Sequence, residues 1–274
     1  MSNQVRYEKA TPGREKTSGL WGDCLEAYAD DPSIGSYYFE DFVLPFTNTT
    51  DASATTNGWF IQDAAAGGTV ESFASAAGVD SVATLGATTG TDHFGIEAHR
   101  GVTATTLGTV NLPTHSTDPR GDVVFEARVK LDGSDNYFIG LTEPIVEFLS
   151  ATGTLPTTSD YIGFYRADGG ALKFVCANDN NGGTAVTDEV TLLSAAAIGA
   201  LDDYINLGFK VSRDQKLTIY VNGVSYHTEA ATISPLAFPI ESLTQKLATT
   251  RGATGDLATV DIDIDWIATF VEAE

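Results

Sequence analysis

The sequence predicts an all-β protein, an antiparallel sandwich of short strands. Three observations lead to this prediction: apolar and polar residues alternate over strand-length segments, Gly-containing turn signals separate those segments, and helical periodicity is scarce. The segment VFEARVKL shows the alternation most clearly, with charged residues on one face and Phe125, Ala127, Val129 and Leu131 on the other. A strand with one buried and one solvated face has this period of two. Many such strands with few helices indicate a sandwich or barrel.

The N-terminal half of the chain is expected to contain brief strands from Tyr37 onward. An aromatic run covers residues 37–42, and Asn57-Gly58 forms a turn before the apolar trio at residues 59–61. Residues 62–120 are rich in Ala, Thr, Gly and Ser, and glycines interrupt them at short intervals. This composition favours short strands joined by turns, because glycine destabilises helices.

The C-terminal half shows stronger strand signals. Strands are expected at residues 137–141, 161–166, 172–176, 205–211, 217–221 and 224–228. Asn222-Gly223 joins the last two, and Asn-Gly between alternating segments is the strongest short-range hairpin signal because both residues must adopt a positive φ. Helical turns are expected only at residues 144–150 and 194–201.

The last strand alternates between isoleucines and aspartates. Val260, Ile262, Ile264 and Trp266 are expected on the core face, and Asp261, Asp263 and Asp265 on the outer face, because successive side chains of a strand point to opposite sides. Three outward carboxylates are most simply a solvated face. A cation site and a docking surface for basic residues are the alternatives.

Two regions are predicted: an extended arm at residues 1–30 and a single sandwich domain at residues 31–274. The arm has no apolar periodicity and cannot bury itself. It is either a frayed terminus or a tether that becomes ordered on an acidic neighbour. The tether interpretation assigns partner binding to Arg6, Lys9, Arg14, Lys16 and Trp21.

Composition excludes several classes of protein. A net charge of −22 over 274 residues, with a pI near 4.3, repels phosphate backbones, so no nucleic-acid partner is expected. No window approaches 18 apolar residues, so no membrane partner is expected. Cys24 and Cys176 form no framework and are predicted to be reduced. Together with an N-terminus that lacks an apolar stretch, this favours synthesis in a cytoplasm.

The sequence predicts no catalytic residue, metal site or cofactor. The paired carboxylates of a sandwich-type glycosidase do not occur on one strand, and GxSxG is absent. His93 and His99 would share a strand face, but they lack further zinc ligands in a convincing spacing. The oxygen-rich loop at residues 178–183 fits either calcium or an ion-free turn.

A resemblance to a known superfamily rests on six segments: FEARVKL, NYFIGL, DYIGFYR, ALKFVC, INLGFKVSRDQKLTIYVNGVSY and VDIDIDWIATF. They resemble the concanavalin A-like, laminin-G-type jelly-roll sandwich over residues 37–272, which implies a jelly-roll β-sandwich. The superfamily includes lectins, glycosidases, lyases and structural modules, so the fold leaves the function open. The polar arm and the acidic, Ala/Thr/Gly-rich sandwich also resemble tailed-phage head decoration or cement proteins.

These resemblances lead us to expect a non-enzymatic capsid decoration protein on a phage virion. Its expected partners are the major capsid protein and two further copies of itself, because capsids offer threefold positions. The alternative is a lectin-like carbohydrate-binding module, attached to a virion or free. A polysaccharide-cleaving enzyme is the least supported possibility.

Overall fold

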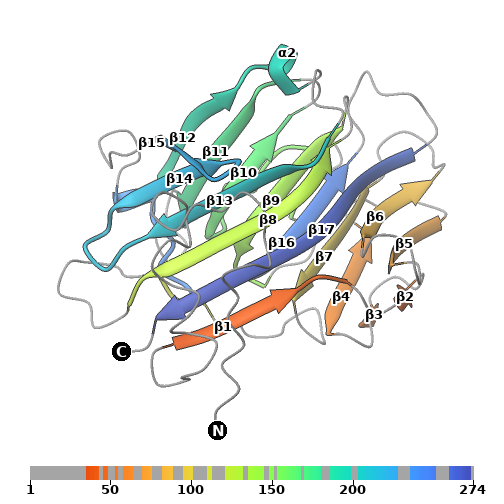
Figure 1. Cartoon of the computed structure of the whole chain (residues 1–274), viewed down its shortest axis with the longest axis horizontal. Coiled ribbons are helices and arrows are strands. Elements are labelled where there is room, and N and C mark those ends of the chain that lie inside the picture. Colours follow the sequence, from red (N-terminus) through yellow and green to blue (C-terminus); the bar gives the residue numbers. More distant parts are fainter. Residues whose placement is uncertain are drawn as a thin grey trace, which may run out of the picture.

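The protein folds as a β-sandwich in which two antiparallel sheets are stacked face to face (Figure 1). The computed structural model describes residues 35–42, 46–48, 53–54, 58–63, 70–75, 82–88, 95–100, 110–112, 121–131, 135–144, 148–150, 153–167, 170–179, 186–198, 203–227, 235–250 and 259–272. Every strand pairing in these ranges is antiparallel. The predicted all-β jelly-roll sandwich is confirmed.

The nine-stranded sheet lies in front in Figure 1 and contains the C-terminal strand near its middle. In spatial order its strands are β15 (Val224–His227), β14 (Leu217–Val221), β13 (Ile205–Val211), β8 (Val123–Leu131), β17 (Thr259–Glu272), β6 (Ala83–Thr88), β5 (Val70–Ser75) and β2 (Phe46–Asn48), while β1 (Gly35–Glu40) pairs with the last six residues of β17.

The eight-stranded sheet lies behind it. Its strands, in spatial order, are β12 (Val186–Leu193), β11 (Leu172–Asn178), β10 (Tyr161–Arg166), β9 (Asn136–Thr142), β16 (Thr244–Thr250), β7 (Gly95–Arg100), β4 (Trp59–Asp63) and β3 (Ser53–Ala54). The described helical turns are short: α2 (Ala195–Ile198) falls within the segment 194–201, and a 3₁₀ turn covers Pro235–Ala237. The described residues of 144–150 are not helical.

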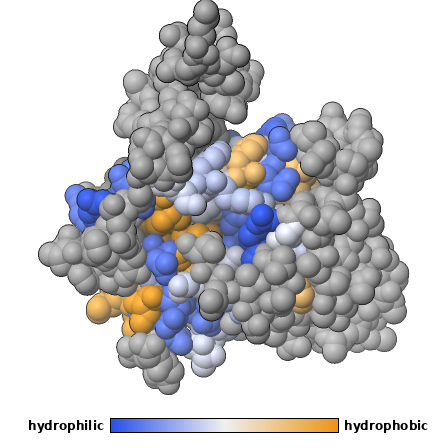
Figure 2. Space-filling view, turned by 90° about the horizontal axis from the view of Figure 1, so that it is seen from below, coloured by the Kyte–Doolittle hydropathy of each residue, from blue (hydrophilic) through white to orange (hydrophobic). Residues whose placement is uncertain are grey.

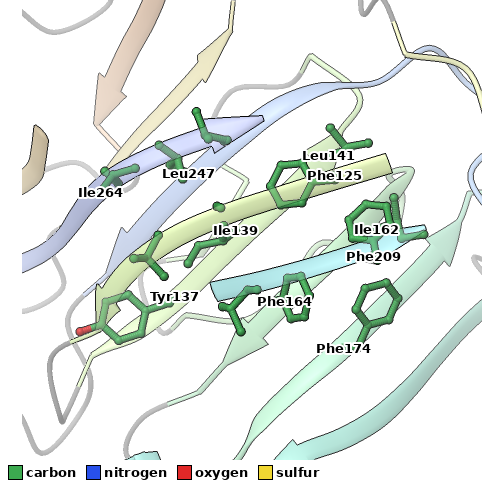
Figure 3. Close-up of a cluster of buried hydrophobic side chains, with 14 of the residues drawn as sticks. Phe125, Tyr137, Ile139, Leu141, Ile162, Phe164, Phe174, Phe209, Leu247 and Ile264 are labelled. Carbon is green, nitrogen blue, oxygen red and sulfur yellow. The ribbon is translucent and has the colours of Figure 1, made fainter. Parts of the chain in front are cut away.

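The core fills the space between the sheets with aromatic and branched side chains (Figure 3). Phe125 and Phe209, on neighbouring strands of one sheet, stack with ring centroids 5.2 Å apart. Phe174 meets Phe209 edge-on from the opposite sheet at 5.4 Å. Such aromatic contacts add to the free energy gained by removing apolar surface from water. The predicted inward face of β8 is confirmed, because its four apolar residues belong to this core.

The hairpin predicted from Asn-Gly is also confirmed. β14 and β15 are joined by Asn222 and Gly223, whose φ angles are 52° and 74°. The turn is tied back to β13, because Asn222 donates its backbone N–H to the Asn206 carbonyl and accepts the Asn206 N–H on its side-chain oxygen.

The expected placement of Trp266 on the core face is wrong. β17 contains a β-bulge, since Ile264 pairs with Val129 but Trp266, two residues on, pairs with the next residue, Arg128. A bulge places an extra residue in one strand and reverses the alternation of side chains beyond it. Ile264 and Ile267 therefore point into the core, and Trp266 points to the outer face of the sheet.

The predicted partner-binding residues lie outside the described part of the chain. This holds for Arg6, Lys9, Arg14, Lys16 and Trp21, and also for Cys24, His93 and His115. The arm and its role in binding stay predictions.

Two facing glycines bring β9 and β10 close together in the middle of the eight-stranded sheet. Gly140 on β9 and Gly163 on β10 lie directly opposite each other in the antiparallel pair. A Cβ on Gly163 would lie 2.6 Å from the carbonyl oxygen of Ile139 and 2.8 Å from the Cα of Gly140. Backbone atoms cannot move aside as a flexible side chain can, so this register requires glycine.

We expect Gly163→Ala to destabilise the protein, because the added methyl group must push two paired strands apart. Overpacking of this kind lowers the free energy of unfolding by about 1–3 kcal/mol. Chemical denaturation followed by tryptophan fluorescence measures the change. An unaltered unfolding midpoint would show that the strands are not as close as described.

Candidate functional site

The outer face of the nine-stranded sheet carries a second hydrophobic layer, separate from the core. Val124, Ala268 and Phe270 point away from the sandwich interior and are nevertheless buried. The rings of Tyr37, Tyr220 and Trp266 pack against them. An outer sheet face is ordinarily polar in a two-layer sandwich, so this concentration of aromatic side chains needs an explanation.

Three rings at one end of this layer form what we call the aromatic platform: Tyr37 and Phe39 from β1, and Trp266 from β17. The rings of Tyr37 and Phe39 lie 6.3 Å apart and are nearly parallel, with an interplanar angle of 10°. The ring of Phe39 lies 6.1 Å from that of Trp266. Phe39 is 46% exposed, so the platform is open to solvent at its centre.

The pairing of β1 with β17 explains why these rings meet. Tyr37 pairs with Phe270 and Phe39 pairs with Ala268, so the side chains on one face of β1 continue the outer face of β17. The bulge puts Trp266 on the same face. Without it, Trp266 would enter the core and Phe39 would have no aromatic neighbour on β17.

Charged groups border the platform. Arg128, the pairing partner of Trp266, forms an ion pair with Asp265, and its guanidinium group lies 4.9 Å above the ring of Tyr204. Asp263 accepts a hydrogen bond of 2.6 Å from the Thr84 hydroxyl. Of the three outward aspartates, these two have described side chains, and both are engaged by neighbouring groups rather than only by solvent. Aromatic rings beside such polar groups are typical of ligand-binding surfaces.

The space-filling view of Figure 2 shows the same mixture on the side of the molecule seen from below, where hydrophobic and hydrophilic residues lie side by side. Other exposed large hydrophobic residues in the described ranges are Val186, Val224, Tyr226 and Leu236. Tyr226 is the one aromatic residue among these four.

The outer face of the eight-stranded sheet is different, because it buries charged groups beneath the protein's own chain. Glu97 on β7 and Lys246 on β16 form an ion pair of 2.6 Å, and each side chain is 1% exposed. The Glu97 carboxylate also accepts the backbone N–H groups of Phe148 and Leu149, at 2.9 and 2.6 Å. The carboxylate is therefore fully occupied by protein donors.

The ring of Phe148 packs against aromatic rings of the neighbouring strands β9 and β10. It lies 4.5 Å from the ring of Phe138 and 5.5 Å from that of Tyr161. Lys246 Nζ lies 6.0 Å from the same ring. Phe148 and Leu149 thus cover the ion pair and close this part of the sheet face.

His99, singled out from the sequence, lies next to this cluster. It pairs with Lys246 across the strands, and its ring lies tilted against that of Phe60 with centroids 5.1 Å apart. His99 is almost fully buried. Sequence reasoning missed Glu97 and Lys246, because their pairing depends on which strands become neighbours.

The segment considered for calcium begins with two described residues. Asn178 donates a side-chain hydrogen bond to the Phe238 carbonyl, and the backbone N–H of Asp179 donates to the Asp160 carboxylate. Residues 180–183 lie outside the described ranges. Among the residues described, no group of three or more His, Cys, Asp or Glu side chains is arranged to hold a metal ion.

Asp160 organises this end of the sheet. Its carboxylate accepts three backbone N–H groups, those of Asp179, Ile240 and Glu241, at 2.6–2.8 Å. Burial raises the pKa of the nearby Glu143 carboxyl group, a hydrogen bond from Ser159 lowers it, and the negative charge of Asp160 raises it further. Glu143 is thus a carboxyl group that the folded state makes less acidic.

Cys176 is a free thiol buried in the core. It donates a hydrogen bond to the Ala237 carbonyl, and burial raises its pKa. A buried thiol of raised pKa is a poor nucleophile.

In the described part of the chain, no helix is long and apolar enough to cross a membrane.

Comparison with known proteins identifies the fold. No protein-family model and no curated protein matches the sequence. The carbohydrate recognition domain of Emp47p is similar in structure, with a TM-score of 0.51, 12% identity, and coverage of 89% of this chain and 99% of that one. An endo-1,3-beta-glucanase from Streptomyces sioyaensis gives a TM-score of 0.45, 13% identity and coverage of 89% and 99%. Alginate lyase A1-II′ gives 0.43, 14% identity and coverage of 86% and 97%.

The Emp47p domain shares the fold of this chain, in agreement with the predicted jelly-roll sandwich. The prediction that the chain is not an enzyme does not stand. It treated a missing carboxylate motif as decisive, whereas the structures found to be similar include glucanases and an alginate lyase. At 11–14% identity the similarity concerns the fold alone.

We expect Lys246→Met to be strongly destabilising, because it leaves the Glu97 carboxylate buried without its cation. Breaking a buried ion pair in this way lowers the free energy of unfolding by about 3–5 kcal/mol. The control is Lys173→Met on the same sheet face, whose exposed partner is Glu189; its expected effect is under about 1 kcal/mol. Equal effects of the two substitutions, measured by urea denaturation, would contradict the buried pair.

Glu143→Gln tests the acidic end of the sheet. Because the folded state raises the pKa of Glu143, ionisation at neutral pH opposes folding in the wild type. The variant should therefore be more stable than the wild type at about pH 7–8. Its advantage should shrink as the pH falls through the raised pKa toward the ordinary value of 4.5. Melting temperatures of both proteins from neutral pH down to this value measure the difference, with Glu189→Gln as an exposed control. An advantage that grows on acidification would reverse the assigned shift.

Proposed function

We propose that this protein binds carbohydrate, and that the aromatic platform of Tyr37, Phe39 and Trp266 is the surface that contacts the sugar. The observation that carries the proposal is the outward turn of Trp266 at the β17 bulge, which sets it beside the exposed Phe39. A lectin-like site needs exposed aromatic side chains that stack on sugar rings. The sequence placed Trp266 in the core, where it could not do so, whereas its outward position makes it available for stacking.

The platform suits a sugar ring chemically. One side of a pyranose ring presents C–H groups, which pack against aromatic faces, while its rim presents hydroxyl groups that need donors and acceptors. The ion pair of Arg128 with Asp265 stands beside Trp266 and offers both. The similarity to the carbohydrate recognition domain of Emp47p supports the same class of ligand.

The capsid-decoration role is a separate prediction from the style of the sequence. Its trimer, its capsid partner and its location on a virion depend on the arm, and the residues assigned to that contact lie outside the described ranges. A virion protein that binds glycans would satisfy both ideas.

Trp266→Ala is expected to weaken glycan binding at least about tenfold, because truncating an aromatic anchor of the site removes about 1.4 kcal/mol or more. A glycan array identifies the ligand, and titration calorimetry measures the affinity of the wild type and the variant. Leu236→Ala is the matched control: Leu236 is 73% exposed and lies in the 3₁₀ turn that contacts β11 and β12 of the other sheet.

Three results would decide the matter. Loss of binding in Trp266→Ala but not in Leu236→Ala supports the platform. Binding that survives Trp266→Ala moves the site elsewhere on the protein. No binding to any glycan refutes the proposal. The same samples, assayed for new reducing ends or unsaturated sugars, show whether a bound glycan is also cleaved.

A further inference from the structure

We propose that the aromatic platform selects electrically neutral glycans over polyuronates, and that the ion pair of Arg128 with Asp265 is the specificity-determining element. This inference rests on the proposed function and names the chemical class of its ligand. It follows from how the charges on the outer face of the nine-stranded sheet are paired.

Among the described residues, each cation on this face has a carboxylate partner, with one exception. Arg128 is paired with Asp265, and Lys210 with Asp122 at 2.5 Å. Arg213 lies 3.8 Å from Glu272. Among the described residues, the exposed Lys130 has no ion pair, but it faces Asp263 directly across the strand pair. A sugar carboxylate would have to displace a protein carboxylate to gain a cation.

The charge of the whole protein works in the same direction. A net charge of −22 produces a negative potential that opposes the approach of any polyanion. A polyuronate carries a negative charge on each sugar, so it would meet this repulsion along its full length. A neutral glycan experiences neither penalty.

The Arg128–Asp265 pair matches hydroxyl groups rather than carboxylates. A hydroxyl donates one hydrogen bond and accepts others, so a guanidinium group next to a carboxylate satisfies both needs. The Arg128 side chain is 40% exposed and that of Asp265 is 18% exposed, so both reach the surface beside Trp266. The Tyr204 ring makes a cation–π contact with the guanidinium group and helps to hold it in place.

The test is Asp265→Asn, which keeps the size of the side chain but leaves Arg128 without its carboxylate. The probes are a neutral β-glucan oligosaccharide and an alginate oligosaccharide of matched length. For the wild type we expect binding of the neutral probe with less than about twofold change between roughly 0.05 and 0.5 M NaCl, because screening acts on charge pairs. We expect no measurable binding of alginate.

The variant should change this preference. Its affinity for the neutral probe should fall about three- to tenfold, the loss expected from one weakened hydrogen bond. It should gain alginate binding that weakens as salt is added. Asp214→Asn is the matched control, because it changes the net charge equally in an exposed pair with Lys216 at the β13–β14 turn; it should leave both affinities unchanged. Equal melting temperatures show that the platform is intact.

The outcomes separate this inference from the proposed function. Alginate binding by the wild type that requires Trp266 and falls with salt would overturn the neutral preference while supporting a glycan site. An Asp265→Asn variant with unchanged affinities for both probes would overturn the role of the ion pair. Failure of the wild type to bind any glycan refutes both proposals.

Discussion

β17 crosses the middle of the nine-stranded sheet and contributes side chains to both of its faces. Which of its side chains point inward therefore determines both the packing of the core and the composition of the outer face. Before the bulge, Ile262 and Ile264 face the core. After the bulge, Ile267 and every second residue that follows it face the core. The single extra residue leaves the core continuous, since Ile264 and Ile267 are both buried. It also turns Trp266 outward, where it packs against Val124, Ala268 and Phe270. The bulge thus supplies an outward indole while the residues on either side of it stay in the core.

The two outer faces of the sandwich use their polar groups differently. On the eight-stranded sheet, Glu97 and Lys246 are buried under Phe148, and the Glu97 carboxylate is held by Lys246 and two backbone N–H groups. A buried ion pair contributes little net stability but is costly to break, so it fixes how the covering segment lies. On the nine-stranded sheet, Arg128 and Asp265 remain partly exposed beside open aromatic rings. Only this second arrangement presents its polar groups to a ligand in the described structure.

The sequence predicts those structural features that neighbouring residues specify, and it fails for features that depend on which strands pair. The inward face of β8 and the turn at Asn222-Gly223 follow from period-two alternation and positive φ, which neighbouring residues specify. The orientation of Trp266 does not, because VDIDIDW alternates without interruption up to the tryptophan and the bulge arises from pairing with β8. Glu97 and Lys246 lie 149 positions apart, and nothing in either segment indicates that β7 and β16 become neighbours. The fold was therefore predictable, whereas the site depended on register.

The platform is assembled from the two ends of the described chain, and this has a consequence for its stability. Tyr37 and Phe39 come from β1, and Trp266 comes from β17, so the rings meet only when these strands pair. That pairing needs Gly35, where a Cβ would lie 2.4 Å from the ring of Phe270. A glycan bound as proposed would contact both strands and would be lost if β1 detached. Such binding would therefore stabilise the β1–β17 pairing by mass action, by an amount set by glycan concentration and affinity. On this proposal, the pairing of β1 with β17 and the binding of glycan form one cooperative unit.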